Sequence, residues 1–257
     1  MPLTLKNFYV NIPWWDMDNR TLSQTSNSLW SGFYTWVYVK EDGSKIFFSC
    51  ASVQRIYECT LWTPFDISSL SLTKYISSAY PEDLTFSTDG TKMFVLKSDA
   101  SPYQVIRYTL STAWDISTAT QDQAITAWTD NGDRWLYITP DGKTIYRSMA
   151  WQNTLHKATL STAWDLTTAS AWDTTNNYGW VAIWFGNGWK FFARKPDNSS
   201  SLSWNELSTP YDLSTISTSW TKALWWNDYW LWLWFDNTWH MAFAANGNYR
   251  TITKYTL

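Results

Sequence analysis

Leu-Ser-Thr-Ala-Trp-Asp occupies residues 110–115 and recurs letter for letter at residues 160–165. Weaker copies, Leu-Trp-Thr-Pro-Phe-Asp and Leu-Ser-Thr-Pro-Tyr-Asp, occupy residues 61–66 and 207–212, and a shortened copy covers residues 13–16. The aspartates that end the five copies stand at positions 16, 66, 115, 165 and 212. Near-constant spacing of this size is the signature of a repeat array.

A second fixed point in each unit is a tight-turn signal between apolar, alternating residues. Asp-Gly stands at residues 42–43, 89–90 and 141–142, and Asn187-Gly188 and Asn237-Thr238 hold the same place in the last two units. Asp-Gly and Asn-Gly supply the positive φ that a two-residue hairpin needs. The second unit then divides into strands near residues 84–87, 92–97, 104–110 and 118–125, which is the content of a propeller blade.

The sequence therefore predicts an all-β fold, a five-bladed β-propeller of four-stranded antiparallel blades over residues 13–257. The last unit stops after its third strand, so we expect residues near 20–25 to pair with the C-terminal strand. That pairing would close the ring and remove an exposed sheet edge. Residues 1–12 are expected to form an N-terminal arm outside the ring. A helical fold is disfavoured because no long stretch keeps a 3.6-residue period.

Composition disfavours several classes of partner. The chain has 257 residues, a formal net charge of -3 and 16% charged residues, against about 25% in typical domains. Nothing in this balance favours nucleic acid or an anionic lipid surface. The longest apolar run, residues 229–235, is far shorter than the ~20 residues of a membrane helix. The informative excess is aromatic, with 22 Trp, 15 Tyr and 12 Phe.

The first ten residues and the cysteines bear on the cellular compartment. Residues 1–10 lack a basic start and a long apolar core, so we expect no secretory signal and synthesis in a cytosol. Cys50 and Cys59 are the only cysteines. They are offset along the two strands of the predicted hairpin, so we expect no disulfide between them.

Two stretches of the second unit carry a family resemblance: Phe-Ser-Thr-Asp-Gly-Thr-Lys-Met-Phe-Val-Leu at residues 86–96 and Tyr-Thr-Leu-Ser-Thr-Ala-Trp-Asp-Ile-Ser-Thr-Ala-Thr at residues 108–120. They resemble a repeat family with an FSPDGTKMYVL…YTLSTPWDIS pattern, itself similar to YVTN surface-layer and NHL-type propellers. Members often occur in tailed phages and marine bacteria as virion or surface proteins. The resemblance covers residues from about 13 to 257, and the hairpins at 186–189 and 237–239 depart from the pattern.

Residues that could carry catalysis have structural interpretations. His156 stands where other units have Tyr57 and Ile106, which predicts a partly buried structural role, and His240 is expected on a solvated strand. Neither has a partner at metal-ligand spacing, and the chain has no phosphate loop or nucleophile elbow. The aspartates of the repeat are expected to accept backbone N–H bonds in turns. We therefore expect no catalytic residue, no metal and no cofactor.

The loops that join the fourth strand of one blade to the first strand of the next combine aromatic rings with carboxylates or amides. Aromatic faces stack on sugar rings, and Asp or Asn can bind hydroxyl groups in a concave site. The predicted glycan-binding residues are Trp30, Tyr80, Asp83, Trp128, Asp130, Asp133, Trp172, Tyr178, Trp226 and Asp228. The competing interpretation is that these rings fill the channel and hold the blades together.

The hairpins of the last two units carry aromatic residues where the first three units have Lys, Ser, Thr or Pro. An exposed apolar patch on a soluble protein commonly marks a protein interface. The predicted interface residues are Phe185, Trp189, Phe235 and Trp239. The expected partner is a second copy of the chain or a larger assembly.

Taken with the resemblance, the sequence predicts a non-catalytic phage virion protein, such as a fibre, decoration or receptor-binding component. Its expected partners are other virion proteins or itself and a host-surface glycan, without nucleic acid or membrane insertion, and it would be made in the host cytoplasm. One alternative is a soluble multivalent lectin. A third is a glycoside-cleaving enzyme, which would need two carboxylates about 5 or about 6.5–9.5 Å apart.

Overall fold

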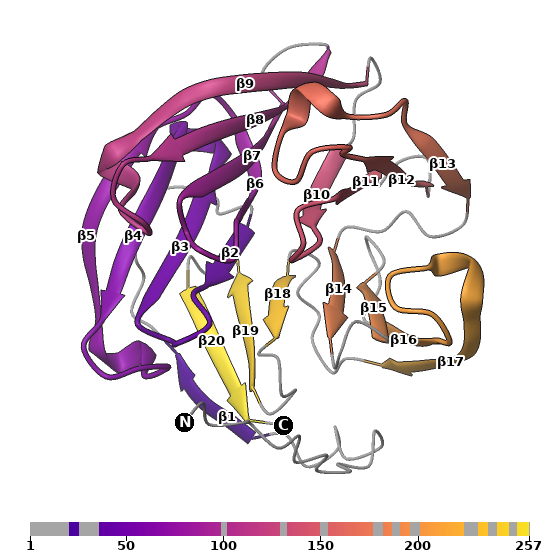
Figure 1. Cartoon of the computed structure of the whole chain (residues 1–257). Coiled ribbons are helices and arrows are strands. Elements are labelled where there is room, and N and C mark those ends of the chain that lie inside the picture. Colours follow the sequence, from indigo (N-terminus) through magenta and orange to yellow (C-terminus); the bar gives the residue numbers. More distant parts are fainter. Residues whose placement is uncertain are drawn as a thin grey trace, which may run out of the picture.

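A computed structural model describes residues 21–25, 36–98, 102–128, 133–149, 154–176, 182–186, 191–195, 201–223, 231–235, 241–246 and 251–256. These residues form twenty strands and several short 3-10 helices, and none of the described elements is an α-helix. No helix in these ranges is long and apolar enough to cross a bilayer. The strands make five four-stranded antiparallel sheets (Figure 1).

Strand order follows chain order in the first four sheets. The first contains β2 (Trp36–Val39), β3 (Lys45–Cys50), β4 (Arg55–Leu61) and β5 (Leu70–Ser77), and the second contains β6 (Pro81–Phe86), β7 (Lys92–Lys97), β8 (Tyr103–Leu110) and β9 (Ala119–Trp128). The third contains β10 (Asp133–Ile138), β11 (Thr144–Met149), β12 (Thr154–Thr159) and β13 (Asp173–Asn176), and the fourth contains β14 (Ala182–Gly186), β15 (Phe191–Lys195), β16 (Ser201–Leu207) and β17 (Ile216–Ala223). The strands predicted for the second unit agree with those observed to within three residues.

The fifth sheet combines the two ends of the described chain. It contains β18 (Leu231–Phe235), β19 (Met241–Asn246), β20 (Thr251–Thr256) and, as its outermost strand, β1 (Thr21–Thr25). β1 pairs antiparallel with β20, placing Thr21 opposite Thr256 and Thr25 opposite Thr253. This is the pairing expected for residues near 20–25.

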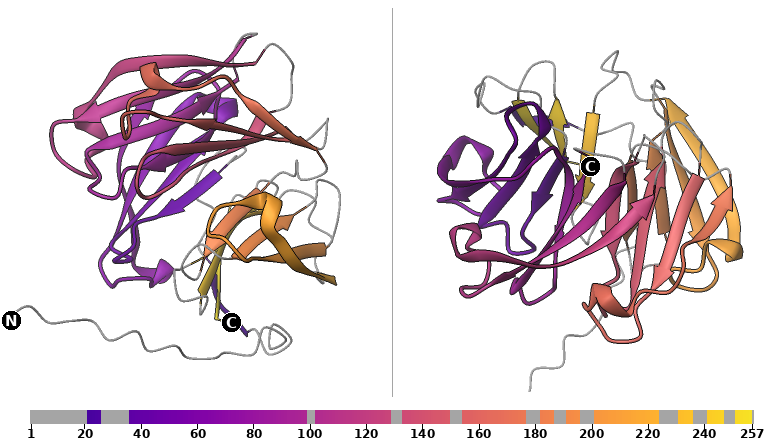
Figure 2. Two further views of the ribbon diagram at one scale, coloured as in Figure 1. Left: turned by 45° about the vertical axis from the view of Figure 1, so that its right-hand side comes forward. Right: turned by 90° about the horizontal axis from the view of Figure 1, so that it is seen from above.

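The first strands of the five sheets lie innermost around a common centre (Figure 1). They contact one another in chain order, β2 with β6, β6 with β10, β10 with β14 and β14 with β18, and β18 in turn contacts β2. Figure 2 shows the same arrangement from two further directions, with neighbouring sheets packed face to face. The fold is therefore all-β and β-propeller-like.

The core lies between adjacent sheets because the inner strands are apolar on both faces. In β7, Met93 and Val95 pack with Phe47 of the first sheet, while Phe94 packs with Leu136 of the third. A strand buried on both faces reads as a nearly continuous apolar run, as Met93 to Leu96 does. Each sheet thus depends on its neighbours for burial.

The two cysteines lie at different positions along the pair β3 and β4. Cys50 stands opposite Arg55, and Cys59 stands opposite Ile46. Both are buried, and neither forms a disulfide. The predicted offset between them is confirmed.

Candidate functional site

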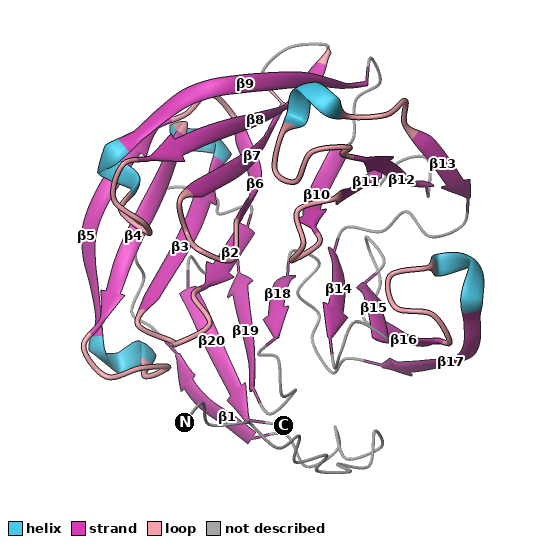
Figure 3. Cartoon of the chain, viewed as in Figure 1, coloured by secondary structure: helices cyan, strands magenta, loops and turns pink. Residues whose placement is uncertain are grey.

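The repeated hexapeptide forms the corner between the third and fourth strands of a sheet, where Figure 3 shows a short helix. In the second sheet, Asp115 caps η4 (Ile116–Thr118) by accepting the backbone N–H of Ser117 at 3.0 Å. Three more aspartates cap η3 (Ile67–Ser69), η5 (Leu166–Thr168) and η6 (Leu213–Thr215) in the same way, namely Asp66, Asp165 and Asp212. The structural role predicted for these four aspartates is confirmed, and Asp16 lies outside the described residues.

The aromatic residue before each capping aspartate has a positive φ, between 60° and 64° at Phe65, Trp114, Trp164 and Tyr211. At Trp114 the backbone N–H donates to the carbonyl of Gly90, and at Trp164 it donates to the carbonyl of Gly142. These bonds draw the corner onto the hairpin that joins the first two strands. The rings of Trp114 and Trp164 therefore lie at the end of the innermost strands where this hairpin stands, which we call the hairpin end.

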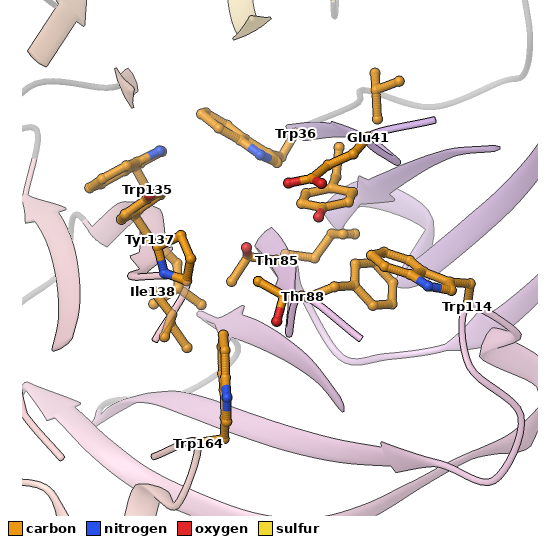
Figure 4. A pocket seen from close by; sticks show the side chains of 15 residues that line it. Trp36, Glu41, Thr85, Thr88, Trp114, Trp135, Tyr137, Ile138 and Trp164 are labelled. Atoms are coloured by element: carbon orange, nitrogen blue, oxygen red, sulfur yellow. The ribbon is translucent and has the colours of Figure 1, made fainter. Parts of the chain in front are cut away.

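A pocket opens at that end, between β2, β6 and β10 (Figure 4). We call it the hairpin-end pocket, and its cavity volume is about 70 Å³. The described residues that line it are Trp36, Tyr38, Val39, Glu41, Leu84, Thr85, Phe86, Thr88, Trp114, Trp135, Leu136, Tyr137, Ile138, Pro140 and Trp164. Seven of these residues are aromatic, and Glu41 is the only one that carries a charge.

The aromatic walls of the hairpin-end pocket are mutually supported. The rings of Trp135 and Tyr137 stack at 5.7 Å with an interplanar angle of 5°. Trp36 and Trp135 are 3% and 1% exposed, so their rings are held in an almost dry environment. Burial, and after it the nearby charge of Glu41, raises the pKa of Tyr38. The pocket therefore combines π faces with a negative charge beside them.

The structure describes the side chains of three predicted glycan-binding residues, Tyr80, Asp83 and Trp172. None of them is among the described residues that line this pocket, and the prediction for Asp83 is wrong. Tyr80 is 44% exposed. Asp83 is fully buried, and its two carboxylate oxygens accept the backbone N–H groups of Leu84 and Leu136, both at 2.6 Å. Burial raises the pKa of Asp83 well above its usual range. Asp83 fastens β6 to β10 and cannot also face a ligand.

Trp172 follows the competing interpretation, in which the loop aromatics hold the blades together. Its indole N–H donates to the carbonyl of Thr126 in the second sheet at 3.2 Å. The guanidinium of Arg147 lies 4.8 Å from the centre of its ring. For two further predicted residues, Trp128 and Asp133, the structure describes only the backbone, and five lie outside the described residues: Trp30, Asp130, Tyr178, Trp226 and Asp228.

The predicted interface patch is wrong at Phe185. This side chain is fully buried, and its ring lies 5.0 Å from that of Tyr137, 5.2 Å from that of Tyr146 and 5.4 Å from that of Tyr211. Two of these rings, Tyr137 and Tyr146, belong to the third sheet. They cover Phe185, which would be exposed if the fourth sheet stood alone. Phe235 is described only in its backbone, and Trp189 and Trp239 lie outside the described residues.

His156 is a structural residue, and it is more deeply buried than expected. It is 3% exposed and lies between two threonine hydroxyls, with Thr154 Oγ1 3.1 Å from Nε2 and Thr174 Oγ1 3.0 Å from Nδ1. Burial, and after it the charge of Arg147, lowers the pKa of His156 to about 4. Among the residues that the structure describes, no three His, Cys, Asp or Glu side chains are grouped to hold a metal ion, and His240 lies outside them.

Sequence reasoning missed the hairpin-end pocket because it interpreted the aromatic residues of the innermost strands only as packing between blades. A signal was present in two of these strands. Trp36 and Tyr38 are two residues apart, as are Trp135 and Tyr137, and alternate residues of a strand share a face. Both pairs line the pocket.

No protein-family model matches the sequence, and no curated protein matches it either. Among solved structures, a functionally unknown protein from Desulfotomaculum acetoxidans is similar at 10% identity over 84% of this chain and 64% of that one, with a TM-score of 0.51. Hydrazine synthase from Kuenenia stuttgartiensis is similar at 15% identity over 83% of this chain and 55% of that one, with a TM-score of 0.53. A 6-phosphogluconolactonase-like protein from Bacteroides uniformis is similar at 16% identity over 75% of this chain and 58% of that one, with a TM-score of 0.51. The chain spans less than two thirds of each of these proteins. Such likenesses support the β-propeller-like fold and nothing beyond it.

Proposed function

We propose that the chain is a closed five-bladed β-propeller that recognises a ligand without transforming it, and that the hairpin-end pocket is the recognition site. The carrying observation is that aromatic rings from three sheets converge on one pocket, which the carboxylate of Glu41 also lines. The contacts of the innermost strands, which run in order from β2 to β18 and back to β2, support closure. So does the pairing of β1 with β20.

The use of the acidic residues favours recognition over catalysis. Glu58, buried in the first sheet, accepts bonds from the Lys45 ammonium at 2.6 Å and from the backbone N–H of Ile116 at 3.0 Å. The carboxylate of Asp122 is paired with Arg107 at 2.6 Å. Glycoside cleavage needs two facing carboxylates, and among the described residues that line the pocket Glu41 is the only one with a carboxylate.

Blocking the pocket tests the recognition site. Thr88 is exposed and lines the pocket, so Thr88→Trp should fill the mouth. Ser111→Trp is the matched control, because Trp62 already occupies that position of the hexapeptide in the first sheet and is 78% exposed. Against a panel of glycans and small organic ligands, we expect the affinity for a bound ligand to fall at least about tenfold in Thr88→Trp only. A panel without any ligand, or a ligand bound equally by both variants, would contradict the proposal.

A disulfide across the two chain ends tests closure. Thr25 and Thr253 are partners in the antiparallel pair of β1 and β20, where Cα atoms of partners lie about 4.5–5.5 Å apart, within bridging range. The double variant Thr25→Cys/Thr253→Cys should oxidise readily. In the chain-entropy model, a bridge over so long a loop stabilises by about 3–5 kcal/mol. Failure of the bridge to form under oxidation would contradict closure.

The virion role remains a prediction from the resemblance, and so does glycan binding through the loops between blades. Both are compatible with a recognition propeller. Tail or capsid genes beside this one would support the virion role, and an unrelated gene neighbourhood would count against it.

A further inference from the structure

We propose that two indole walls of the hairpin-end pocket, Trp114 and Trp164, are each positioned by side chains of the preceding sheet. The first sheet holds the corner that carries Trp114, and the second sheet holds the corner that carries Trp164. The positioning residues are Lys45 and Glu58 for Trp114, which we call the first clamp, and Arg107 and Gln123 for Trp164, which we call the second clamp. This inference rests on the proposed recognition function and names residues that set the shape of its site.

The corner that carries Trp114 has a backbone conformation that its surroundings must hold in place. Trp114 has a φ of 63°, in the left-handed region that is unfavourable for a residue with a bulky side chain. Such a conformation persists where neighbouring structure fixes it. The N–H of Trp114 is bound within its own sheet, by the carbonyl of Gly90 at 3.0 Å. The carbonyl of Trp114 is bound from outside the sheet.

The first clamp binds the corner at two backbone groups. The Lys45 ammonium donates to the carbonyl of Trp114 at 2.7 Å and to one carboxylate oxygen of Glu58 at 2.6 Å. The other oxygen of Glu58 accepts the N–H of Ile116 at 3.0 Å. Glu58 is 1% exposed, and hydrogen bonds to charged groups are stronger than neutral ones. One ion pair of the first sheet therefore holds the second sheet on both sides of Asp115.

The second clamp binds the same two backbone groups of the next corner. Arg107 donates to the carbonyl of Trp164 at 2.8 Å, and the amide oxygen of Gln123 accepts the N–H of Leu166 at 2.8 Å. The amide nitrogen of Gln123 also donates to the carboxylate of Asp165 at 2.9 Å. Arg107 and Gln123 stand opposite each other in the pair of β8 and β9. They therefore form one unit at the face of the second sheet.

The two clamps reach the same backbone groups with different residues from different strands. Lys45 lies on the second strand of its sheet, whereas Arg107 lies on the third strand of the next. Lys92 occupies the position of Lys45 in the second sheet, three residues after the Asp of Asp-Gly, yet Arg107 is the residue that binds the carbonyl of Trp164. A contact that merely followed from the repeat would use equivalent positions. The shared feature is the hold on the corner itself.

The clamps matter for recognition because the two rings lie on different sides of the pocket (Figure 4). Each ring belongs to one sheet, and the backbone that carries it is bound by another. The positions of Trp114 and Trp164 in the pocket therefore depend on how three successive sheets are held together.

Fluorine NMR tests the first clamp without any ligand. The whole chain is labelled with fluorotryptophan, and the resonances of Trp114 and Trp164 are assigned from Trp114→Phe and Trp164→Phe. Because Lys45→Met alone would leave the buried carboxylate of Glu58 without its ammonium partner, the double variant Lys45→Met/Glu58→Gln is used. We expect it to shift the Trp114 resonance by more than its linewidth and to leave that of Trp164 in place. Lys45→Arg, which can still donate to the carbonyl, should keep the Trp114 resonance near its original position.

The second clamp should give the opposite pattern. Arg107→Met and Gln123→Leu should each shift the Trp164 resonance and leave that of Trp114 in place. Lys92→Met is the matched control, because it removes one positive charge from the same sheet as Arg107→Met does. It should move neither resonance.

Selectivity decides the outcome. The proposal is overturned if the resonance of the clamped ring stays in place, or if both resonances move together in one variant, as general loosening of the fold would cause. Should the double variant not fold, an unmoved Trp164 resonance in Arg107→Met overturns the proposal by itself. A ligand panel without any binder would contradict the recognition function and leave the clamps standing, so the two failures are distinguishable.

Discussion

The indole of Trp114 lies directly against Gly90, so that a Cβ atom on Gly90 would stand 2.1 Å from the ring. The two residues belong to the two sequence signals that repeat along the chain, the hairpin Asp-Gly and the hexapeptide corner. The backbone N–H of Trp114 donates to the carbonyl of Gly90 at 3.0 Å. Gly43 meets Phe65, and Gly142 meets Trp164, in the same way. The repeat is thus one contact between two turns, copied from sheet to sheet.

Gly90→Ala should therefore destabilise the protein strongly. Gly90 has a φ of +70°, which costs a residue with a Cβ about 1 kcal/mol, and the methyl group would also displace the Trp114 ring. We expect the free energy of unfolding to fall by about 2–4 kcal/mol, measured by denaturant titration.

A double-mutant cycle separates these two causes. In a Trp114→Ala background the ring is gone, so Gly90→Ala should cost only the backbone part, about 1 kcal/mol. An equal cost of Gly90→Ala with and without the Trp114 ring would contradict the proposed contact.

Asp115→Asn should remove an ion pair between sheets while keeping the helix cap. An amide oxygen can still accept the N–H of Ser117, but the pairing of Asp115 with Lys74 of the first sheet is lost. The Lys74 ammonium, with Ser117 after it, lowers the pKa of Asp115 to about 2. Since both side chains are partly exposed, we expect a loss of only about 0.5–1.5 kcal/mol at pH 7.

The pH dependence of that loss follows from the sign of the pKa shift. A carboxyl with a depressed folded pKa contributes stability that is complete above its unfolded pKa of about 3.9 and disappears as the pH falls toward 2. The difference between wild type and Asp115→Asn should therefore shrink between pH 4 and pH 2. Asp212→Asn is the control, because the Ser214 hydroxyl is the main cause of the lowered pKa there, and its effect should be smaller. A constant difference for Asp115→Asn over this range would be inconsistent with the ion pair.

His156 should make the protein less stable in mild acid. Its folded pKa of about 4 lies below the usual value of about 6.5, so the unfolded chain binds the proton more readily. The stabilising contribution is complete above pH 6.5 and is lost as the pH falls toward 4, by about 3 kcal/mol at most. Thermal unfolding between pH 7 and pH 4.5 should show a shallower decline in His156→Gln than in wild type. Parallel curves for the two proteins would refute the shift.

The parts of the fold that could be predicted from sequence are those set by local chemistry. The turn at Gly90 and the cap at Asp115 each depend on residues within one sheet, and both were expected. Asp83 could not be placed in this way, because one of its two donors, the N–H of Leu136, lies in the next sheet. The hairpin-end pocket was missed for the same reason, since its walls come from three sheets. Contacts between sheets are therefore the part of the structure that the repeat period of the sequence does not reveal.

Phe185→Ala tests the packing of the fourth sheet on the third. The hairpin position of Phe185 suggests an exposed side chain whose loss would alter only association, yet the ring is enclosed by tyrosines of two sheets. Truncating a buried Phe costs about 3–5 kcal/mol, so we expect a large fall in the free energy of unfolding and no change in oligomeric state. Trp62→Ala, at a side chain that is 78% exposed, should change stability by less than about 0.5 kcal/mol. If Phe185→Ala proved as stable as Trp62→Ala, the fourth sheet would not pack on the third as described, because truncating an enclosed ring should cost much more stability than truncating an exposed one.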